Sequence, residues 1–152
     1  MKLDAIDCRI LNELQEDGRL SNQDLADKVA LSPSACLRRV KILEEQGAID
    51  RYQAILSPKK LGYELDAIVH ISMEKSGEDW HEAFMSQIKK FDEIIQAHVV
   101  TGGCNYIVYV RTKTLSDFSE FIVRQLYKVN GISDICSYIV LETVKQQSKL
   151  RL

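Results

Sequence analysis

The sequence predicts an α+β protein in which a helical N-terminal domain precedes a βαββαβ unit of ferredoxin-like order. Apolar residues recur at helical spacing as far as residue 47 and alternate with polar residues from residue 65 onward. Between the two patterns, residues 57–64 are polar and rich in turn-forming residues. We therefore expect one domain at residues 3–64, a second at 65–144, and a polar tail at 145–152.

The first predicted helix begins at Asp4, because Ile6, Ile10 and Leu14 follow at helical spacing. The sequence DGR at residues 17–19 ends it, since these residues favour a turn.

Two short helices follow, each with its own start signal. The Ser21 hydroxyl is suited to accept a hydrogen bond from an amide at the first helix start, and Ser32 is suited to cap the second. Pro33 follows at the first helical position, and Gly47 is suited to the left-handed conformation that ends a helix. Because a very short connection separates them, residues 22–41 are predicted to form a helix-turn-helix, which enters the major groove of DNA.

The remaining elements are read from their periodicity. Residues 48–57, AIDRYQAILS, are rich in β-branched and aromatic residues and predict a strand leaving the helical domain. The second domain is predicted to contain strands at residues 65–73, 94–101, 106–112 and 132–144, and helices at 80–91 and 115–129.

Composition limits the functional classes. The 152 residues are 45% hydrophobic and 28% charged, as expected for a globular protein with a real core. The N-terminus has no apolar signal region, and no apolar run approaches the roughly 20 residues that span a membrane, so we expect a cytoplasmic protein with no membrane partner. The four cysteines form no CxxC pair and are expected to be reduced core residues.

The charge balance argues that a single helical domain does not bind DNA tightly. Residues 1–60 hold ten Lys/Arg and ten Asp/Glu, and residues 61–152 hold ten and twelve. Since neither half is basic, positive charge must be placed locally and several domains must act together.

The predicted second helix of the helix-turn-helix has two faces. Its apolar side is expected to pack on the other helices, which leaves a polar side outward. Residues near its start are placed for base edges, and helix N-termini and Lys41 are placed for phosphates. The predicted base readers are Ser34, Ala35, Arg38 and Arg39, and the predicted phosphate contacts are Lys41, Ser21, Asn22 and Ser32. The alternative is a solvated face on an ordinary helical domain.

The run LSPSACLRRVKILEEQG, the turn TGGCNY and the ending SYIVLETVKQQSKLRL together resemble the Lrp/AsnC (feast/famine) family of transcriptional regulators. The resemblance covers nearly the whole chain. It implies an AsnC-type, winged-helix-like DNA-binding domain, a tether strand near residues 51–56, and an effector-binding RAM (ACT-like) domain. It also implies dimers that assemble further, often as a tetramer of dimers, around which double-stranded DNA wraps.

The resemblance further implies a small-molecule effector, usually an amino acid, at the turn between the second and third RAM strands. The implied effector residues are Thr101, Gly102, Gly103, Cys104, Asn105 and Tyr106, with Tyr138, Ile139 and Val140 lining or supporting the pocket. Many family members carry Asp at the position of Asn105. Losing that charge is expected to weaken ammonium binding by about 1–2 kcal/mol, or roughly five- to thirty-fold. Three alternatives stay open: a weakly bound amino acid, another ligand, or none.

No other chemistry is indicated. The histidines show no metal-ligand spacing, and we find no phosphate loop, nucleophile elbow or paired-carboxylate motif, so neither catalytic residues nor a cofactor are predicted. Two alternatives to a regulator come from other classes. One is a decarboxylase-like enzyme acting on tetrapyrroles, with His98 and Arg111 handling substrate carboxylates, and the other is an effector-binding module without an operator.

Overall fold

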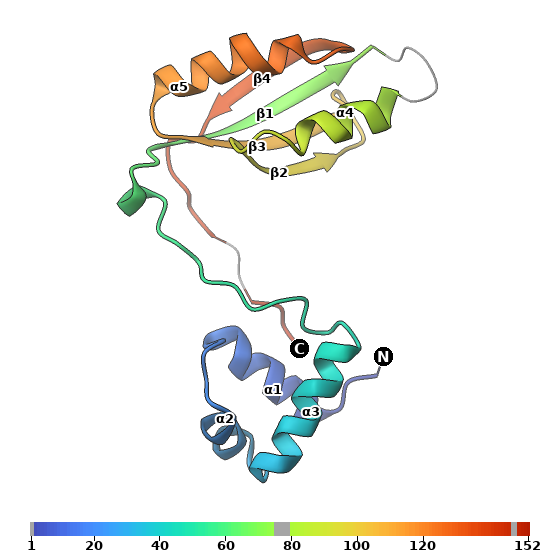
Figure 1. The fold of residues 1–152 in the computed structure, drawn as a ribbon, viewed down its shortest axis with the longest axis vertical. Coiled ribbons are helices and arrows are strands. Elements are labelled where there is room, and N and C mark those ends of the chain that lie inside the picture. The colour runs from blue at the N-terminus through green and yellow to red at the C-terminus, as the bar shows by residue number, and fades with distance from the viewer. Residues whose placement is uncertain (1, 75–79, 147–148) are drawn as a thin grey trace. The chain divides into compact units, whose positions relative to one another are not determined.

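The computed structural model describes residues 2–74, 80–146 and 149–152 (Figure 1). It divides the chain into two compact units, one comprising Met1–Ile55 with Lys145–Leu152 and the other Leu56–Val144. None of the described helices is long and apolar enough to cross a membrane.

Three helices form the first unit: α1 (Ala5–Glu16), α2 (Asn22–Val29) and α3 (Pro33–Glu45). Their apolar faces meet in one core, which is formed by Ile10, Leu11, Leu25, Ala26, Val29, Cys36 and Leu43. This arrangement confirms the predicted helical domain.

The helix boundaries follow the capping residues. The Ser21 side chain accepts from the Asp24 amide and the Ser32 side chain from the Ala35 amide, which confirms both predicted caps. Gly47 has φ +71°, a left-handed conformation just past α3. The turn between α2 and α3 places Ala30 at φ 57°, a conformation that costs a residue with a Cβ about 1–2 kcal/mol.

The prediction of a strand at residues 48–57 was wrong for the single chain, because these residues belong to no strand there. A strand needs a neighbour to accept and donate its backbone hydrogen bonds, and none of the described residues serves as one. Ile55 and Leu56 are consequently 95% and 66% exposed. Residues 48–57 therefore have a sequence typical of a strand but pair with no strand in the part of the chain that the structure describes.

The second unit has the predicted βαββαβ order. After a 3-10 turn at Lys59–Leu61, its elements are β1 (Leu65–Met73), α4 (Trp80–Ile88), β2 (Ile94–Val99), β3 (Tyr106–Thr112), α5 (Leu115–Glu120) and β4 (Ile132–Ile139). The strands form one antiparallel sheet in the order β2-β3-β1-β4. Helix α4, strand β2 and strand β4 end earlier than predicted, at Ile88, Val99 and Ile139. The helix predicted at residues 115–129 is α-helical only to Glu120 and continues as a π turn, Phe121–Gln125, and a 3-10 turn, Leu126–Lys128.

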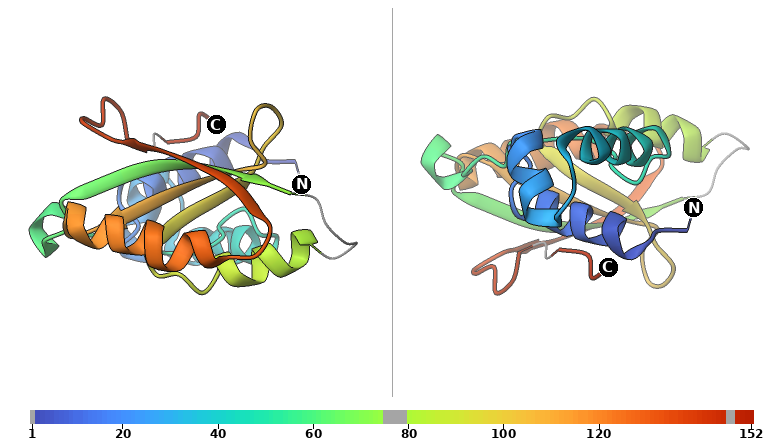
Figure 2. Two further views of the ribbon diagram at one scale, coloured as in Figure 1. Left: turned by 90° about the horizontal axis from the view of Figure 1, so that it is seen from above. Right: turned by 90° about the horizontal axis from the view of Figure 1, so that it is seen from below.

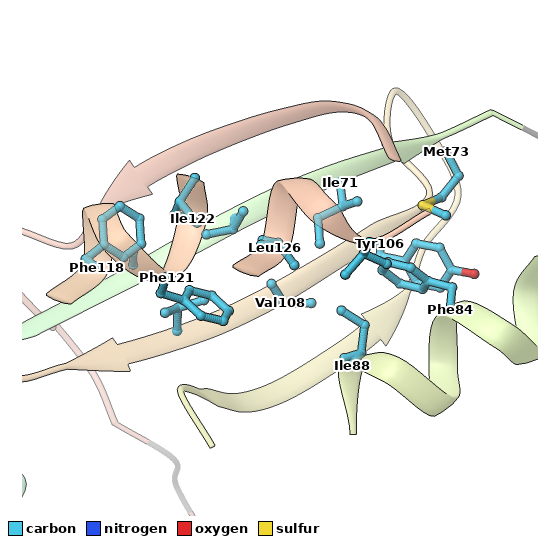
Figure 3. Close-up of a cluster of buried hydrophobic side chains, with 14 residues drawn as sticks. Ile71, Met73, Phe84, Ile88, Tyr106, Val108, Phe118, Phe121, Ile122 and Leu126 are labelled. Atoms are coloured by element: carbon cyan, nitrogen blue, oxygen red, sulfur yellow. The ribbon is translucent and has the colours of Figure 1, made fainter. Parts of the chain in front are cut away.

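Helices α4 and α5 cover the same face of this sheet (Figure 2). Alternate residues of β1 and β3 point into the core that the helices close, including Ile71 and Val108 (Figure 3). Phe84 and Ile88 of α4 and Phe118 of α5 fill it from the helical side. The pattern is the period-two alternation of a sheet with one buried face.

The opposite face of the sheet is open in the single chain. It carries half-buried Ile68, Ile107 and Tyr109, and Tyr138 on β4 is 52% exposed. Along β1 and β3 these side chains alternate with buried ones. The sheet therefore has apolar residues on both faces, but only one face is covered in the single chain.

Candidate DNA-reading helix and effector turn

Helix α3 presents its polar side to solvent. Ser34, Arg38 and Lys41 are exposed and Ala35 is half-buried, while Cys36 and Leu43 hold the opposite side in the core. Within the described ranges, no carboxylate lies at ion-pair distance from Arg38 or Lys41. Both cations are therefore available to an anionic partner or to base acceptors.

Arg39 is engaged within its own unit. Its Nη1 lies 2.8 Å from Asp4 Oδ2 and 2.6 Å from Asp7 Oδ1, so one guanidinium joins α3 to the first turn of α1. The hydrogen bonds to Asp7 and then Asp4 raise the pKa of Arg39. The Asp7 amide, followed by Arg39, holds the pKa of Asp4 below its usual range. Of the two adjacent arginines, Arg38 alone projects freely.

The predicted phosphate contacts also organise the helix-turn-helix. Ser21 Oγ donates to Asp24 Oδ2 at 2.6 Å, and Ser32 Oγ lies 3.3 Å from Ser34 Oγ. Asn22 Nδ2 donates to the Pro33 carbonyl at 2.9 Å, which fixes the start of α2 against the start of α3. These residues lie at two helix N-termini, where amide groups favour an anion.

The turn between β2 and β3 is fastened to β1 by Asn105. The backbone amide of Asn105 donates to the Ile71 carbonyl at 3.0 Å, and the side-chain Oδ1 of Asn105 accepts from the Met73 backbone amide at 2.7 Å. The pairing of β1 with β3 ends at Ile71, and β1 shifts register against β4 between Ser72 and Met73. The Asn105 side chain therefore replaces the ladder partner that the Met73 amide lacks.

The rest of the turn is open. Thr101, Gly102 and Gly103 are exposed, and Cys104 is half-buried. A Cβ added to either glycine would meet nothing within 4 Å, but Gly102 has φ +127° and Gly103 does not have a positive φ. Gly102 is thus required by the backbone, whereas Gly103 keeps that surface clear.

Tyr106 lies inside the core and not on the turn surface. It is 1% exposed, and its hydroxyl lies 2.5 Å from His81 Nδ1 on α4. Figure 3 shows its ring beside Phe84, at a centroid distance of 4.3 Å. Burial raises the pKa of Tyr106.

The predicted effector residues near the C-terminus, Tyr138, Ile139 and Val140, are only partly near this turn. Ile139 pairs with Ala67 at the start of β1, about 20 Å along the strand from Met73 at roughly 3.3 Å per residue. Tyr138 leans back, with its ring 5.0 Å from that of His70. The Cys136 thiol raises the pKa of Tyr138, and Cys104 on the turn makes the smallest contribution to the same shift. The single chain therefore brings Tyr138 toward the turn and leaves Ile139 and Val140 apart from it.

Comparison with known proteins interprets this pairing of a helix-turn-helix with a sheet domain. Residues 3–50 match the winged helix-turn-helix DNA-binding family, and residues 66–150 match the Lrp/AsnC ligand binding domain. The chain belongs to the Lrp/AsnC family. This Lrp/AsnC protein is a DNA-binding transcriptional regulator with the family's ligand-binding domain, as the sequence resemblance predicts.

Several relatives match the Lrp/AsnC chain along nearly its whole length. It is 41% identical over 150 residues to the leucine-responsive regulatory protein of Haemophilus influenzae, covering 99% of this chain and 90% of that protein. The Escherichia coli K12 protein of the same name is 40% identical over 148 residues, covering 97% and 90%. A transcriptional regulator from Neisseria meningitidis, solved as an L-Met complex, has TM-score 0.94 and 37% identity, covering 98% and 96%.

Two contacts in these sites were not predicted from the sequence. The D-x-x-D spacing of Asp4 and Asp7 signals a capping box, which the structure contains, but their joint contact with Arg39 has no local signal. The bond from the Met73 amide to Asn105 joins residues 32 apart and has none either.

Proposed function

We propose that this regulator reads DNA with α3 and responds to an amino acid bound at the β2–β3 turn. Ser34, Ala35 and Arg38 face base edges in the major groove. Arg39 holds α3 against α1 and adds a contact to a base at the edge of the surface that reads DNA. Phosphates are contacted by Lys41, Ser21, Asn22 and Ser32. The observation that carries this proposal is the unpaired, exposed Arg38 guanidinium on a capped recognition helix.

Arg38→Ala tests the reading role. We expect it to lower affinity for a site selected in vitro by the wild-type protein and to relax preference at one base position, with a discrimination loss of roughly 1–3 kcal/mol. Arg9→Ala is the matched control, because Arg9 is an exposed arginine on α1. Gel-shift titration and footprinting measure both. Unchanged affinity and footprint in Arg38→Ala would remove Arg38 from the readers.

The assembly we propose is a homodimer that associates further as a tetramer of dimers. Support comes from the open sheet face and from the partnerless strand sequence around Ile55 and Leu56. Pairing the DNA-binding units also compensates for the low net charge of each unit, because once one unit has bound DNA the second unit binds the same DNA intramolecularly. Leu56→Glu should shift the mass measured by light scattering toward smaller species, whereas Leu141→Glu, at a 97% exposed position, should not. Equal masses would refute a role for this segment.

An amino-acid effector is supported by the matched ligand-binding domain and by the Neisseria relative solved with L-Met. The open backbone at Gly103 suits a ligand carboxylate. Since Ile139 and Val140 lie away from the turn of their own chain, we propose that a second copy completes the pocket.

Calorimetry with an amino-acid panel tests the effector. We expect weak binding by the wild-type protein and roughly five- to thirty-fold tighter binding by Asn105→Asp, because a carboxylate binds ammonium more strongly than a neutral amide does. Tight binding by the wild type that Asn105→Asp weakens would overturn this account of the turn.

A catalytic role is not proposed, and the regulator is placed in the cytoplasm with the DNA it binds. Arg111 is held by Asp66 through two bonds of 2.6 and 2.9 Å, and His98 lies against Tyr109 at a centroid distance of 6.0 Å. His98 pairs with Ile107, so Arg111 lies about 13 Å farther along β3. The two do not converge on one substrate group. An uncoloured preparation supports the regulator, and a bound tetrapyrrole, seen as visible absorbance, would favour the enzyme.

A further inference from the structure

The C-terminal tail is bound to the end of α1. Gln15 Nε2 donates to the Leu150 carbonyl at 3.2 Å, and the Leu150 amide donates to Gln15 Oε1 at 2.8 Å. One side-chain amide thus satisfies both backbone groups of one tail residue. Next to it, Lys149 forms an ion pair with Glu16.

These contacts define a register. Two adjacent residues on α1 bind two adjacent residues of the tail, one through the backbone and one through charge. The amide of Gln15 pairs with the tail as a neighbouring strand would, whatever the Leu150 side chain is. The ion pair then selects a basic residue immediately before it, which fixes which part of the tail is held.

The tail changes the charge of the helical unit. Residues 1–55 hold eight Lys/Arg and ten Asp/Glu, a net charge of −2. Residues 145–152 add three basic residues and no acidic one, so the unit that includes them has a net charge of +1. Within the part of the chain that the structure describes, the tail makes no hydrogen bond or ion pair with the predicted DNA contacts.

We infer that the C-terminal tail is a working part of the DNA-binding unit: Gln15 and Glu16 dock it on α1 through Lys149 and Leu150. The basic residues of the tail, Lys145, Lys149 and Arg151, supply positive charge that the three helices lack. This inference rests on the DNA-binding function. Because phosphate attraction is independent of sequence, the contribution is general affinity and not base preference.

Docking is tested without DNA by limited trypsin digestion of the full-length protein. Cleavage after Lys149 requires the lysine to leave Glu16 and the Leu150 peptide to leave Gln15. Gln15→Met removes both hydrogen bonds and keeps the length of the side chain. We expect the initial cleavage rate after Lys149, relative to that after Lys145, to rise at least about threefold. Gln23→Met, on an exposed residue of α2, is the control.

The charge contribution is tested by gel shift on a labelled duplex of mixed sequence. The triple variant Lys145→Gln/Lys149→Gln/Arg151→Gln should bind about three- to ten-fold more weakly at low salt, and the difference should shrink as salt rises. The control triple variant Lys89→Gln/Lys90→Gln/Lys128→Gln makes the same charge change at exposed sites in the other unit.

An unchanged cleavage ratio in Gln15→Met overturns the docking, and equal losses in the two triple variants overturn a specific role for the tail. If the wild-type protein bound no duplex at low salt, DNA binding itself would fail, and the trypsin result would still report the docking separately.

Discussion

Replacing Asn105 by Ala should destabilise the sheet domain, because it removes the acceptor of the Met73 amide. That bond is 2.7 Å long and part-buried, and Met73 is 7% exposed. A buried amide left without a partner costs about 1–3 kcal/mol. Asn105→Asp keeps an oxygen at the same place and should cost less than about 0.5 kcal/mol.

Urea unfolding at fixed protein concentration measures the difference. Trp80 is the single tryptophan of the chain and lies on α4, with its ring 6.4 Å from that of Tyr106, so its fluorescence reports the sheet domain. Asn130→Ala, at an exposed loop position, is the matched control. The reasoning is refuted if Asn105→Ala unfolds at the wild-type midpoint, or if Asn105→Asp loses as much stability as Asn105→Ala.

Three further outcomes are expected. Gly102→Ala should cost about 1–2 kcal/mol in the same fluorescence assay because of its positive φ, and Gly103→Ala less than about 0.5; equal costs would contradict the conformational argument. Ala30→Gly should stabilise the helical unit by up to about 1 kcal/mol, the relief of left-handed strain less the added unfolded-state entropy, and a loss in denaturation followed by circular dichroism would oppose this. The pKa of Asp4 in the folded protein lies below 3.8, so the stability that its carboxylate contributes is present above that pH and is lost on acidification. Asp4→Asn keeps a side-chain oxygen for the cap and should flatten the acid unfolding curve below about pH 4. Superimposable curves for the variant and the wild type would refute this.

Local signals in the sequence predicted most of the fold. The caps at Ser21 and Ser32, and the glycine after α3, act within a few residues and were readable for that reason. The βαββαβ order followed from the change of period at residue 65. The strand at residues 48–57 failed because a strand's stability depends on a neighbour, which the sequence of one segment does not contain.

The candidate sites were predicted less completely, since their decisive contacts are long-range. Nothing near Arg39 reveals that Asp4 and Asp7, more than 30 residues away, compete for its guanidinium. The bond between Gln15 and Leu150 spans 135 residues. Periodicity places each residue on a face, but only the packed structure decides which faces meet.

The hydrogen bond from the Met73 amide to Asn105 also bears on how this turn can change in evolution. Asn and Asp codons differ by one base, and both side chains offer the oxygen that this amide needs. A single nucleotide change therefore exchanges a neutral side chain for a charged one at this turn while the bond to the Met73 amide is kept. If the turn binds the effector as proposed, the charge that the ligand meets changes without loss of the contact that fastens the turn to β1.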